Sequence, residues 1–276
     1  MQEFLGFGVV GNFAGHLEQA GESHSFINMK SCEKDAPKGL FPFYVPHELS
    51  YLGRFCVDNE KIILPDDPSM HVQAEPEIAL ECDVKYDKEH LVSQITPNFF
   101  MAFNDTSVRN DRTAQKLSQK KNFSSASKGM GQKIMIDRFV YGGVCNNFSI
   151  ASFLKRDNVW HVYGENSKLV KYEFFYQKLL DWIKDRLNHQ EDCDSLEALR
   201  PFLERHNFPT KIIVTIGATP YMPFAQTHFL QKGDEVAIIA YNHLQYSFEK
   251  IQKLLEEEVL KSKNYANISY ILQKVQ

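Results

Sequence analysis

The stretch Ala74-Glu75-Pro76-Glu77-Ile78-Ala79-Leu80-Glu81-Cys82-Asp83 has the alternating pattern of a β-strand. Because successive side chains of a strand point to opposite faces, one face is apolar and carries Pro76, Ile78, Leu80 and Cys82. The opposite face is acidic and carries Glu75, Glu77, Glu81 and Asp83. Taken alone, this pattern is typical of a half-buried strand with a solvated acidic face. Glu75 and Glu77 also project in parallel, close enough to share one divalent cation.

The overall composition is that of an ordinary globular protein, and it restricts the class of partner. The chain has 276 residues and a formal net charge of −4, so charge gives no reason to expect nucleic acid or an anionic membrane. We recognise no signal peptide and no apolar stretch long enough to span a bilayer. We therefore expect no nucleic-acid partner and no membrane association.

The cysteines indicate the compartment. They are scattered and show no C-x-x-C spacing: Cys32, Cys56, Cys82, Cys145 and Cys193. This spacing argues against a zinc site and against a disulfide framework. It predicts reduced thiols and a cytoplasmic protein.

The remaining chain is predicted to be mostly β with a few helices, in one domain over residues 1–276. Alternating β-branched and aromatic residues predict strands over 134–153, 159–163, 211–216 and 235–241, with a hairpin turn at 156–158. Apolar spacing predicts helices over 172–187 and 247–261, and Asp194 is expected to cap a short helix between them. The fold class is therefore α+β, mostly β, with a helical insertion at about 170–208 and a C-terminal helix at about 247–261.

Three polar segments allow more than one interpretation. The cluster from Asn104 to Arg112 follows an apolar strand and is either a turn or the edge of a site. Residues 116–133 are rich in Lys, Ser and Gly but lack the spacing of a phosphate loop, so a mobile, solvated loop is the simplest interpretation. A lone His such as His16, after the turn at Gly11-Asn12, is more often structural or exposed than catalytic.

The order of these polar clusters resembles that of the fumarylacetoacetate hydrolase superfamily. The resemblance extends over about residues 5–245 and rests on six short motifs. They are Asn12-Phe13-Ala14-Gly15-His16, Glu75-Pro76-Glu77, Asn104-Asp105-Thr106-Ser107-Val108-Arg109, Lys121-Asn122-Phe123, Gly217-Ala218-Thr219-Pro220 and Gly233-Asp234. The E-x-E and N-D-x-S-x-R motifs are the most specific of the six.

The resemblance implies a mixed β-roll, a homodimer and a metal ion held by Glu75, Glu77 and Asp105. Oxygen ligands without His or Cys suit Mg²⁺, Mn²⁺ or Ca²⁺ better than zinc. Arg109 and Lys121 would balance the acidic site and bind the carboxylate of a small anionic substrate, as catalytic and substrate-binding residues. Thr219 could hydrogen-bond to the same carboxylate.

The implied activity is metal-dependent cleavage of a C–C bond in a small 2-oxo acid, such as an acylpyruvate, by hydrolysis or decarboxylation. His16 stands at the family's position for the base that activates water. One alternative is an isomerase or hydratase of a 2-oxo acid. Another is a non-catalytic protein on the same fold that binds a metal or a metabolite.

The chain departs from the family pattern at three positions near these motifs. Gln19 stands where members with a His base commonly have Glu, which would orient the imidazole. Arg112 stands where many members have Gln, and Lys128 stands where a proline often follows the lysine loop. These differences identify the chain as a divergent member and leave water activation by His16 open.

Overall fold

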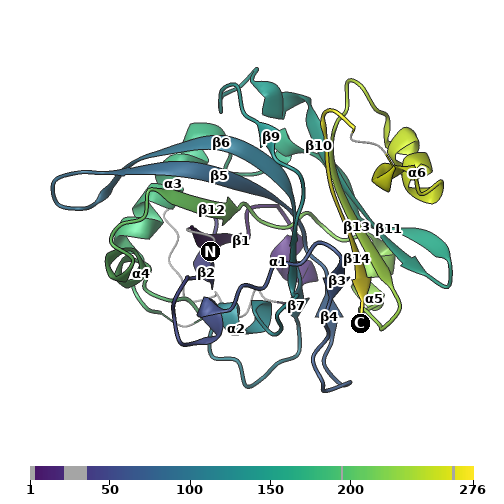
Figure 1. The fold of residues 1–276 in the computed structure, drawn as a ribbon, viewed down its shortest axis with the longest axis horizontal. Coiled ribbons are helices and arrows are strands. Elements are labelled where there is room, and N and C mark those ends of the chain that lie inside the picture. Colours follow the sequence, from purple (N-terminus) through teal and green to yellow (C-terminus); the bar gives the residue numbers. More distant parts are fainter. Residues whose placement is uncertain (1–3, 22–35, 194, 263–264) are drawn as a thin grey trace.

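The computed structural model describes residues 4–21, 36–193, 195–262 and 265–276. Two larger sheets and a two-stranded ribbon make up most of the described chain, with short helices at the periphery (Figure 1). This architecture confirms the predicted class, α+β and mostly β. The division into one domain stays a prediction.

The larger sheet is mixed and strongly curved, and its strands β6 and β5 lie above β12, β1 and β2 in the view of Figure 1. Within it, β1 and β12 run parallel and the other neighbouring strands run antiparallel. Its order is β2 (Gly39–Tyr44), β1 (Leu5–Val10), β12 (Lys211–Thr215), β5 (Pro76–Tyr86), β6 (Val92–Asp105) and β8 (Lys128–Met130), with β9 (Ile134–Met135) also paired to β6.

The second sheet lies beside the first (Figure 1). Its order is β11 (Val159–Lys168), β10 (Phe148–Arg156), β13 (Glu235–Asn242), β14 (Ile268–Val275) and β3 (Lys61–Ile62). A separate ribbon joins β4 (Val72–Gln73) to β7 (Ser107–Val108). The β10–β11 hairpin turns at Asp157 and Asn158, both at positive φ, as the predicted turn requires.

The main core lies between the two sheets, where β6 packs against β13 and β14. Ile78, Leu80 and Cys82 of β5 are buried in this core, which confirms the predicted apolar face. Phe100 of β6 meets Phe148 of β10 edge to face, with 4.8 Å between the ring centroids. The long hairpin of β5 and β6 is therefore fixed on this face. Its other face packs Ala79, Met101 and Phe103 into a second, smaller core and also carries the acidic residues of β5.

Short helices surround the sheets, and α6 covers the outer face of the second sheet (Figure 1). The α-helices are α1 (His16–Gln19), α2 (Leu117–Lys121), α3 (Tyr176–His189), α4 (Arg200–Arg205), α5 (Pro223–Thr227) and α6 (Phe248–Glu256). The 3₁₀-helices are η2 (Tyr51–Gly53), η3 (Val144–Asn147), η4 (Leu169–Lys171) and η5 (Val259–Lys261).

Some predicted boundaries are wrong. Residues 134–153 do not form one strand, because the chain turns at Gly142, whose φ is 81°, and forms η3 before β10 begins. The helix predicted over 172–187 begins at Tyr176, because Phe175 before it is extended. The predicted cap Asp194 lies outside the described residues, and α4 is the short helix found after it.

Two further segments differ from their predictions. The last strand, β14, was not predicted, although its residues alternate in burial and it pairs along β13. The segment 116–133 is not a solvated loop, because it contains α2 and β8 and buries both Lys121 and Lys128.

Among the described residues, no helix has the length and apolar character needed to cross a bilayer. Cys56, Cys82 and Cys145 are buried free thiols, and Cys32 lies outside the described residues.

Candidate metal centre

Two antiparallel strands bring three carboxylates together. Glu77 lies on β5, Glu75 directly precedes this strand, and Asp105 is the last residue of β6. The backbone N–H of Asp105 donates to the carbonyl of Glu75 over 3.1 Å, which fixes the two strand ends beside each other. One oxygen of each carboxylate lies within 4.8 Å of the others, and all three side chains are buried. The described residues therefore contain a group of oxygen donors that could hold one metal ion.

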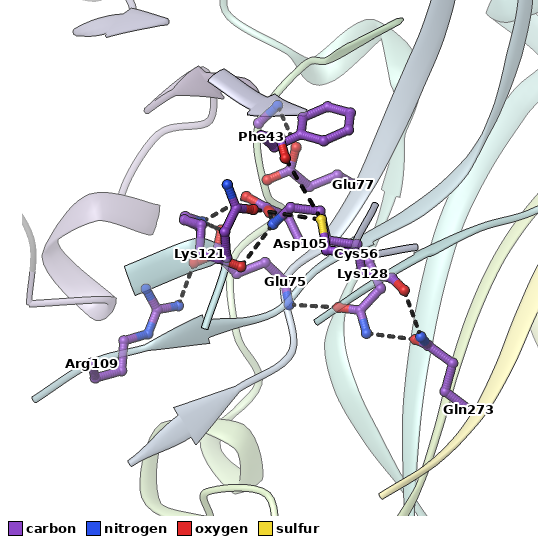
Figure 2. A network of polar contacts seen from close by, with 12 residues as sticks. Phe43, Cys56, Glu75, Glu77, Asp105, Arg109, Lys121, Lys128 and Gln273 are labelled. Carbon is purple, nitrogen blue, oxygen red and sulfur yellow. Dashed lines mark hydrogen bonds and ion pairs between the residues drawn. The ribbon is translucent and has the colours of Figure 1, made fainter. Parts of the chain in front are cut away.

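Three basic side chains surround these carboxylates (Figure 2). Lys121 Nζ lies 2.5 Å from Glu75 Oε2 and 2.8 Å from Asp105 Oδ2. Arg109 Nη2 lies 2.7 Å from Glu75 Oε1. Lys128 Nζ donates to Asp105 Oδ1. The structure thus brings Arg109 and Lys121 to the triad, as the sequence predicts.

Sequence reasoning missed Lys128 as a site residue. Lys128 lies on β8 directly opposite Asp105 of β6, and its side chain is fully buried. The only signal in the sequence was its presence where the family often has proline. A lysine in a Ser- and Gly-rich segment otherwise predicts an exposed side chain.

The carboxylates differ in their balance of charge. Burial alone would raise the pKa of Glu75, but the cations of Lys121 and Arg109 hold that pKa below its ordinary value. Glu77 instead accepts a hydrogen bond from the backbone N–H of Gly217 over 3.1 Å. Burial and the nearby charge of Asp105 raise the pKa of Glu77 well above its ordinary value. A divalent cation would balance the charge of Glu77, so the three carboxylates fit such an ion.

His16 lies at the same site and is buried. Its ring packs against Tyr221 with 5.2 Å between centroids, and its Nδ1 has no hydrogen-bond partner among the described residues. Burial lowers the pKa of His16 to about 4, although the charge of Glu75 opposes the shift. The imidazole is therefore neutral near pH 7, with a free acceptor.

The residues around His16 explain the departure at Gln19. The side chain of Gln19 accepts from the backbone N–H of Tyr221 over 2.7 Å and donates to the Tyr221 carbonyl over 3.3 Å. Gln19 therefore ties α1 to Tyr221, while Glu18 is exposed. The His16 ring itself hydrogen-bonds to the backbone of Thr219.

Arg109 and Tyr221 form one buried network, which sequence reasoning did not identify. Arg109 donates to the Tyr221 hydroxyl over 2.6 Å and to Gln73 Oε1 over 2.8 Å. The Tyr221 hydroxyl donates in turn to the carbonyl of Ala74, next to Glu75. Arg112, by contrast, is exposed.

The glycine turn holds the backbone of Thr219 beside Pro76, the residue between Glu75 and Glu77. Gly217 has a φ of 103°, and a Cβ there would lie 3.0 Å from Asn12, so this turn requires glycine. The backbone N–H of Thr219 donates to the carbonyl of Pro76 over 3.0 Å. Thr219 Oγ1 is buried and has no hydrogen-bond partner in the described part of the chain. This hydroxyl lies next to Gly164 of β11, since a Cβ at Gly164 would be 3.2 Å from Thr219 Oγ1.

Two other motif residues have structural roles. Asn12 donates to the carbonyls of Phe174 and Ile216 and accepts from Phe174 N–H, which joins three segments behind the turn. Asp234 forms a two-point ion pair with Arg156, with contacts of 2.9 and 2.6 Å.

Comparison with known proteins supports the family resemblance. A family model described as "Family of unknown function (DUF5718)" matches residues 22–275. A search of curated proteins gives no match. A search of solved structures gives matches that cover nearly the whole chain.

Three solved structures illustrate the likeness. A protein assigned to the fumarylacetoacetate hydrolase family from Yersinia pestis CO92 has a TM-score of 0.52 and 15% identity, over 87% of this chain and 91% of that one. The 5-carboxymethyl-2-hydroxymuconate delta-isomerase from Mycobacterium smegmatis has a TM-score of 0.52 and 14% identity, over 98% and 78%. A 2-keto-3-deoxy-D-arabinonate dehydratase, complexed with magnesium and 2,5-dioxopentanoate, has a TM-score of 0.50 and 16% identity, over 99% and 72%. At these identities the likeness establishes the fold, which is that of the fumarylacetoacetate hydrolase superfamily.

Proposed function

The chain belongs to the family of unknown function DUF5718, and we propose that it is a metal-dependent enzyme that cleaves a C–C bond in a small 2-oxo acid. The observation that carries this proposal is the buried carboxylate triad Glu75, Glu77 and Asp105, with oxygens within 4.8 Å of one another. Arg109, Lys121 and Lys128 compensate Glu75 and Asp105, but no ion pair to Glu77 is found among the described residues, and a bound cation would supply that missing charge.

The three carboxylates would hold Mg²⁺, Mn²⁺ or Ca²⁺, since they offer only oxygen donors. A bound cation of this kind supplies a Lewis acid that polarises the oxygens of a substrate. The dehydratase of the same fold is complexed with magnesium, which supports the choice of ion.

The surrounding residues of the chain would bind and orient the substrate. Arg109 and Lys121 place positive charge against an otherwise acidic site, so an anionic substrate can enter it. The buried hydroxyl of Thr219 can donate to a substrate carboxylate. Tyr221 and Gln73 hold the Arg109 guanidinium in place for this contact.

His16 would act as the general base and accept a proton during the reaction. Its neutral ring can accept a proton at Nδ1, and its hydrogen bond to the Thr219 backbone helps to fix the ring. In a hydrolysis, this proton comes from the attacking water. The backbone of Thr219 would then take the orienting role that a glutamate has in related sequences.

A second candidate is an isomerase or a hydratase of a 2-oxo acid. The same neutral acceptor on His16 favours it, because it could remove a proton from C3 of the substrate. An isomerase and a dehydratase share the fold. A non-catalytic binding protein is less well supported, since a buried imidazole with an unpartnered Nδ1 near Glu75 has no evident role in binding alone.

Turnover assays would separate these candidates. The purified protein is assayed with acylpyruvates, oxaloacetate and 2-oxo acids that can enolise, with Mg²⁺ and with a chelator. We expect Mg²⁺-dependent C–C cleavage of at least one substrate. Proton exchange at C3 without cleavage would favour the isomerase, and absence of any turnover or exchange with Mg²⁺ or Mn²⁺ would contradict the enzyme proposal.

We also propose that the protein is a cytoplasmic homodimer. Free thiols at Cys56, Cys82 and Cys145 support a reducing compartment, and the family resemblance supports the dimer. Size-exclusion chromatography with light scattering measures the dimer directly, and a monomer at micromolar concentration would contradict it.

A further inference from the structure

Lys128 is the most deeply buried cation of the site. Its Nζ donates to Asp105 Oδ1 and, over 3.0 Å, to the backbone carbonyl of Lys121. The ammonium also lies 5.8 Å from the centroid of the Phe43 ring. The side chain has no exposed surface, so this charge is enclosed by the protein.

The backbone around Lys128 is fixed by a chain of hydrogen bonds that also reaches Glu75 (Figure 2). Gln273 of β14 donates to the carbonyl of Lys128 over 3.0 Å and accepts from Asn104 over 2.8 Å. Asn104 accepts from the backbone N–H of Glu75 over 3.2 Å. On the other side, the N–H of Lys128 donates to the carbonyl of Cys56 over 3.0 Å. The ammonium of Lys128 is therefore held at a set position relative to the triad.

The formal charges can be summed for the state that binds a metal ion, in which Glu77 is ionised. The three carboxylates then contribute −3, and Arg109, Lys121 and Lys128 contribute +3, so their sum is 0 before the charge of the ion is added. A divalent cation raises the sum to +2. Because a buried net charge is costly, the ligand that best fits the loaded site carries two negative charges. Without the ammonium of Lys128, a ligand with one negative charge would neutralise the metal-bound site.

We propose that Lys128 is a positioning residue. Its ammonium adds one positive charge to the metal-bound site, so that this site favours a ligand with two negative charges. The chemical class is a 2-oxo acid in its enolate form, in which the carboxylate and the neighbouring oxygen are both negative. The keto form of a 2-oxo acid with one carboxylate carries a single negative charge and is favoured less. This inference rests on the proposed function, because it requires the triad to bind a divalent cation.

The test compares two ligands of nearly the same shape, oxalate with two negative charges and oxamate with one. Mn²⁺ affinity is measured by electron paramagnetic resonance, and the affinity of each anion for the Mn²⁺-loaded protein by calorimetry. The variants are Lys128→Gln, which keeps hydrogen-bonding groups, and Lys128→Met, which keeps only the aliphatic length. Lys133→Gln is the control, because Lys133 is half-exposed and pairs with Glu81 outside the triad.

Coulomb energy scales with the charge of the ligand, so the two anions should respond differently to loss of the ammonium. In Lys128→Gln we expect Kd to rise about 3- to 10-fold for oxamate and by about the square of that factor, roughly 10- to 100-fold, for oxalate. Mn²⁺ affinity without an anion should be unchanged or tighter, because a repelling charge is removed. Lys133→Gln should change each Kd less than about twofold.

Equal weakening of both anions, or loss of Mn²⁺ binding in the variants, would overturn the proposal, because either result assigns Lys128 a structural role. Failure of both neutral variants to fold would overturn it for the same reason. A wild-type protein that binds no Mn²⁺ would contradict the proposed function as well. Wild-type binding with equal losses in the variants would overturn the role of Lys128 alone.

Discussion

The two ends of β5 carry the same acidic alternation in very different surroundings. At one end, Glu77 and the preceding Glu75 are buried beside Asp105. At the other end, on the same face, Glu81 is partly exposed and Asp83 is exposed. Glu75 pairs with the buried Lys121, whereas Glu81 pairs with Lys133, which is half-exposed.

The difference arises from what covers each end. The end that holds Glu75 and Glu77 is enclosed by α2, β8 and the turn at Gly217, which supply donors and cations. The other end extends with β6 into a hairpin that projects beyond the helices (Figure 1). Alternation therefore tells which side chains share a face, and only the neighbouring segments determine whether that face is a site.

The largest expected effect is on metal-dependent activity. Mutation of a residue that hydrogen-bonds to a metal ligand costs about 10- to 100-fold in metal affinity. Glu77 is a proposed ligand itself, so Glu77→Gln should weaken Mn²⁺ binding by at least about 100-fold. If the ion contributes several kcal/mol to the reaction, turnover should fall on the order of 10³- to 10⁴-fold. Glu81→Gln, at the exposed end of the strand, should change neither Mn²⁺ affinity nor turnover. Similar effects of Glu77→Gln and Glu81→Gln would contradict a metal site at the buried end.

His16 and His90 provide a second pair, because His90 lies in the exposed turn beyond the open end of β5. His16→Ala should lower kcat by about 10²- to 10⁴-fold if the ring is a general base, and leave Mn²⁺ affinity nearly intact. The control His90→Asn suits the positive φ of 57° at that residue and should have no effect on kcat.

The substrate decides which reaction His16 serves. A decarboxylation needs no activated water, so His16→Ala would keep most of its activity on oxaloacetate and lose it on an acylpyruvate. Equal, small losses on both substrates would exclude the general-base role.

Stability gives a third comparison between the two ends. Glu75→Gln leaves the buried cations of Arg109 and Lys121 without one of their partners, so it should cost about 3–5 kcal/mol of unfolding free energy. Glu81→Gln removes a partly exposed pair and should cost less than about 1 kcal/mol. Urea denaturation of the metal-free proteins measures the unfolding free energy of both variants. Equal losses would show that the buried and exposed ion pairs contribute equally to stability.

The smallest expected effect is the pH dependence due to His16. Its pKa in the folded protein is about 4, against 6.5 for an exposed histidine. The unfolded state therefore binds more protons between these pH values, so the stability that His16 contributes is complete above pH 6.5. It is lost as the pH falls toward 4, by up to about 3 kcal/mol.

Imidazole NMR signals assigned through the His16→Ala variant measure this pKa directly. Activity that depends on neutral His16 should persist well below pH 6.5, whereas the unperturbed value would predict a loss there. A measured pKa near 6.5 would contradict the buried placement of the ring.

Much of the fold and the candidate site could be predicted from local sequence. The alternation at 74–83 identified the acidic face, and the order of six short motifs identified the superfamily fold. The paired carboxylates and Asp105 could be named because each follows directly from a motif at a strand end. The tight turn at Asp157-Asn158 was predictable because these residue types tolerate positive φ.

What the sequence could not determine depends on contacts between distant segments. Lys128 belongs to the site only because β8 pairs with β6 opposite Asp105, and Gln273 supports it from the last strand. Gln19 binds the backbone of Tyr221, 202 residues away, so its departure from the family pattern has a structural reason that spacing could not show.

The sequence by itself determined which side chains can share a face and which chemistry they can offer. Only the tertiary structure decided which of them are removed from water and what surrounds them. The physical reason is that charge interactions and desolvation depend on distance and burial, and both are set by segments that are far apart in the chain.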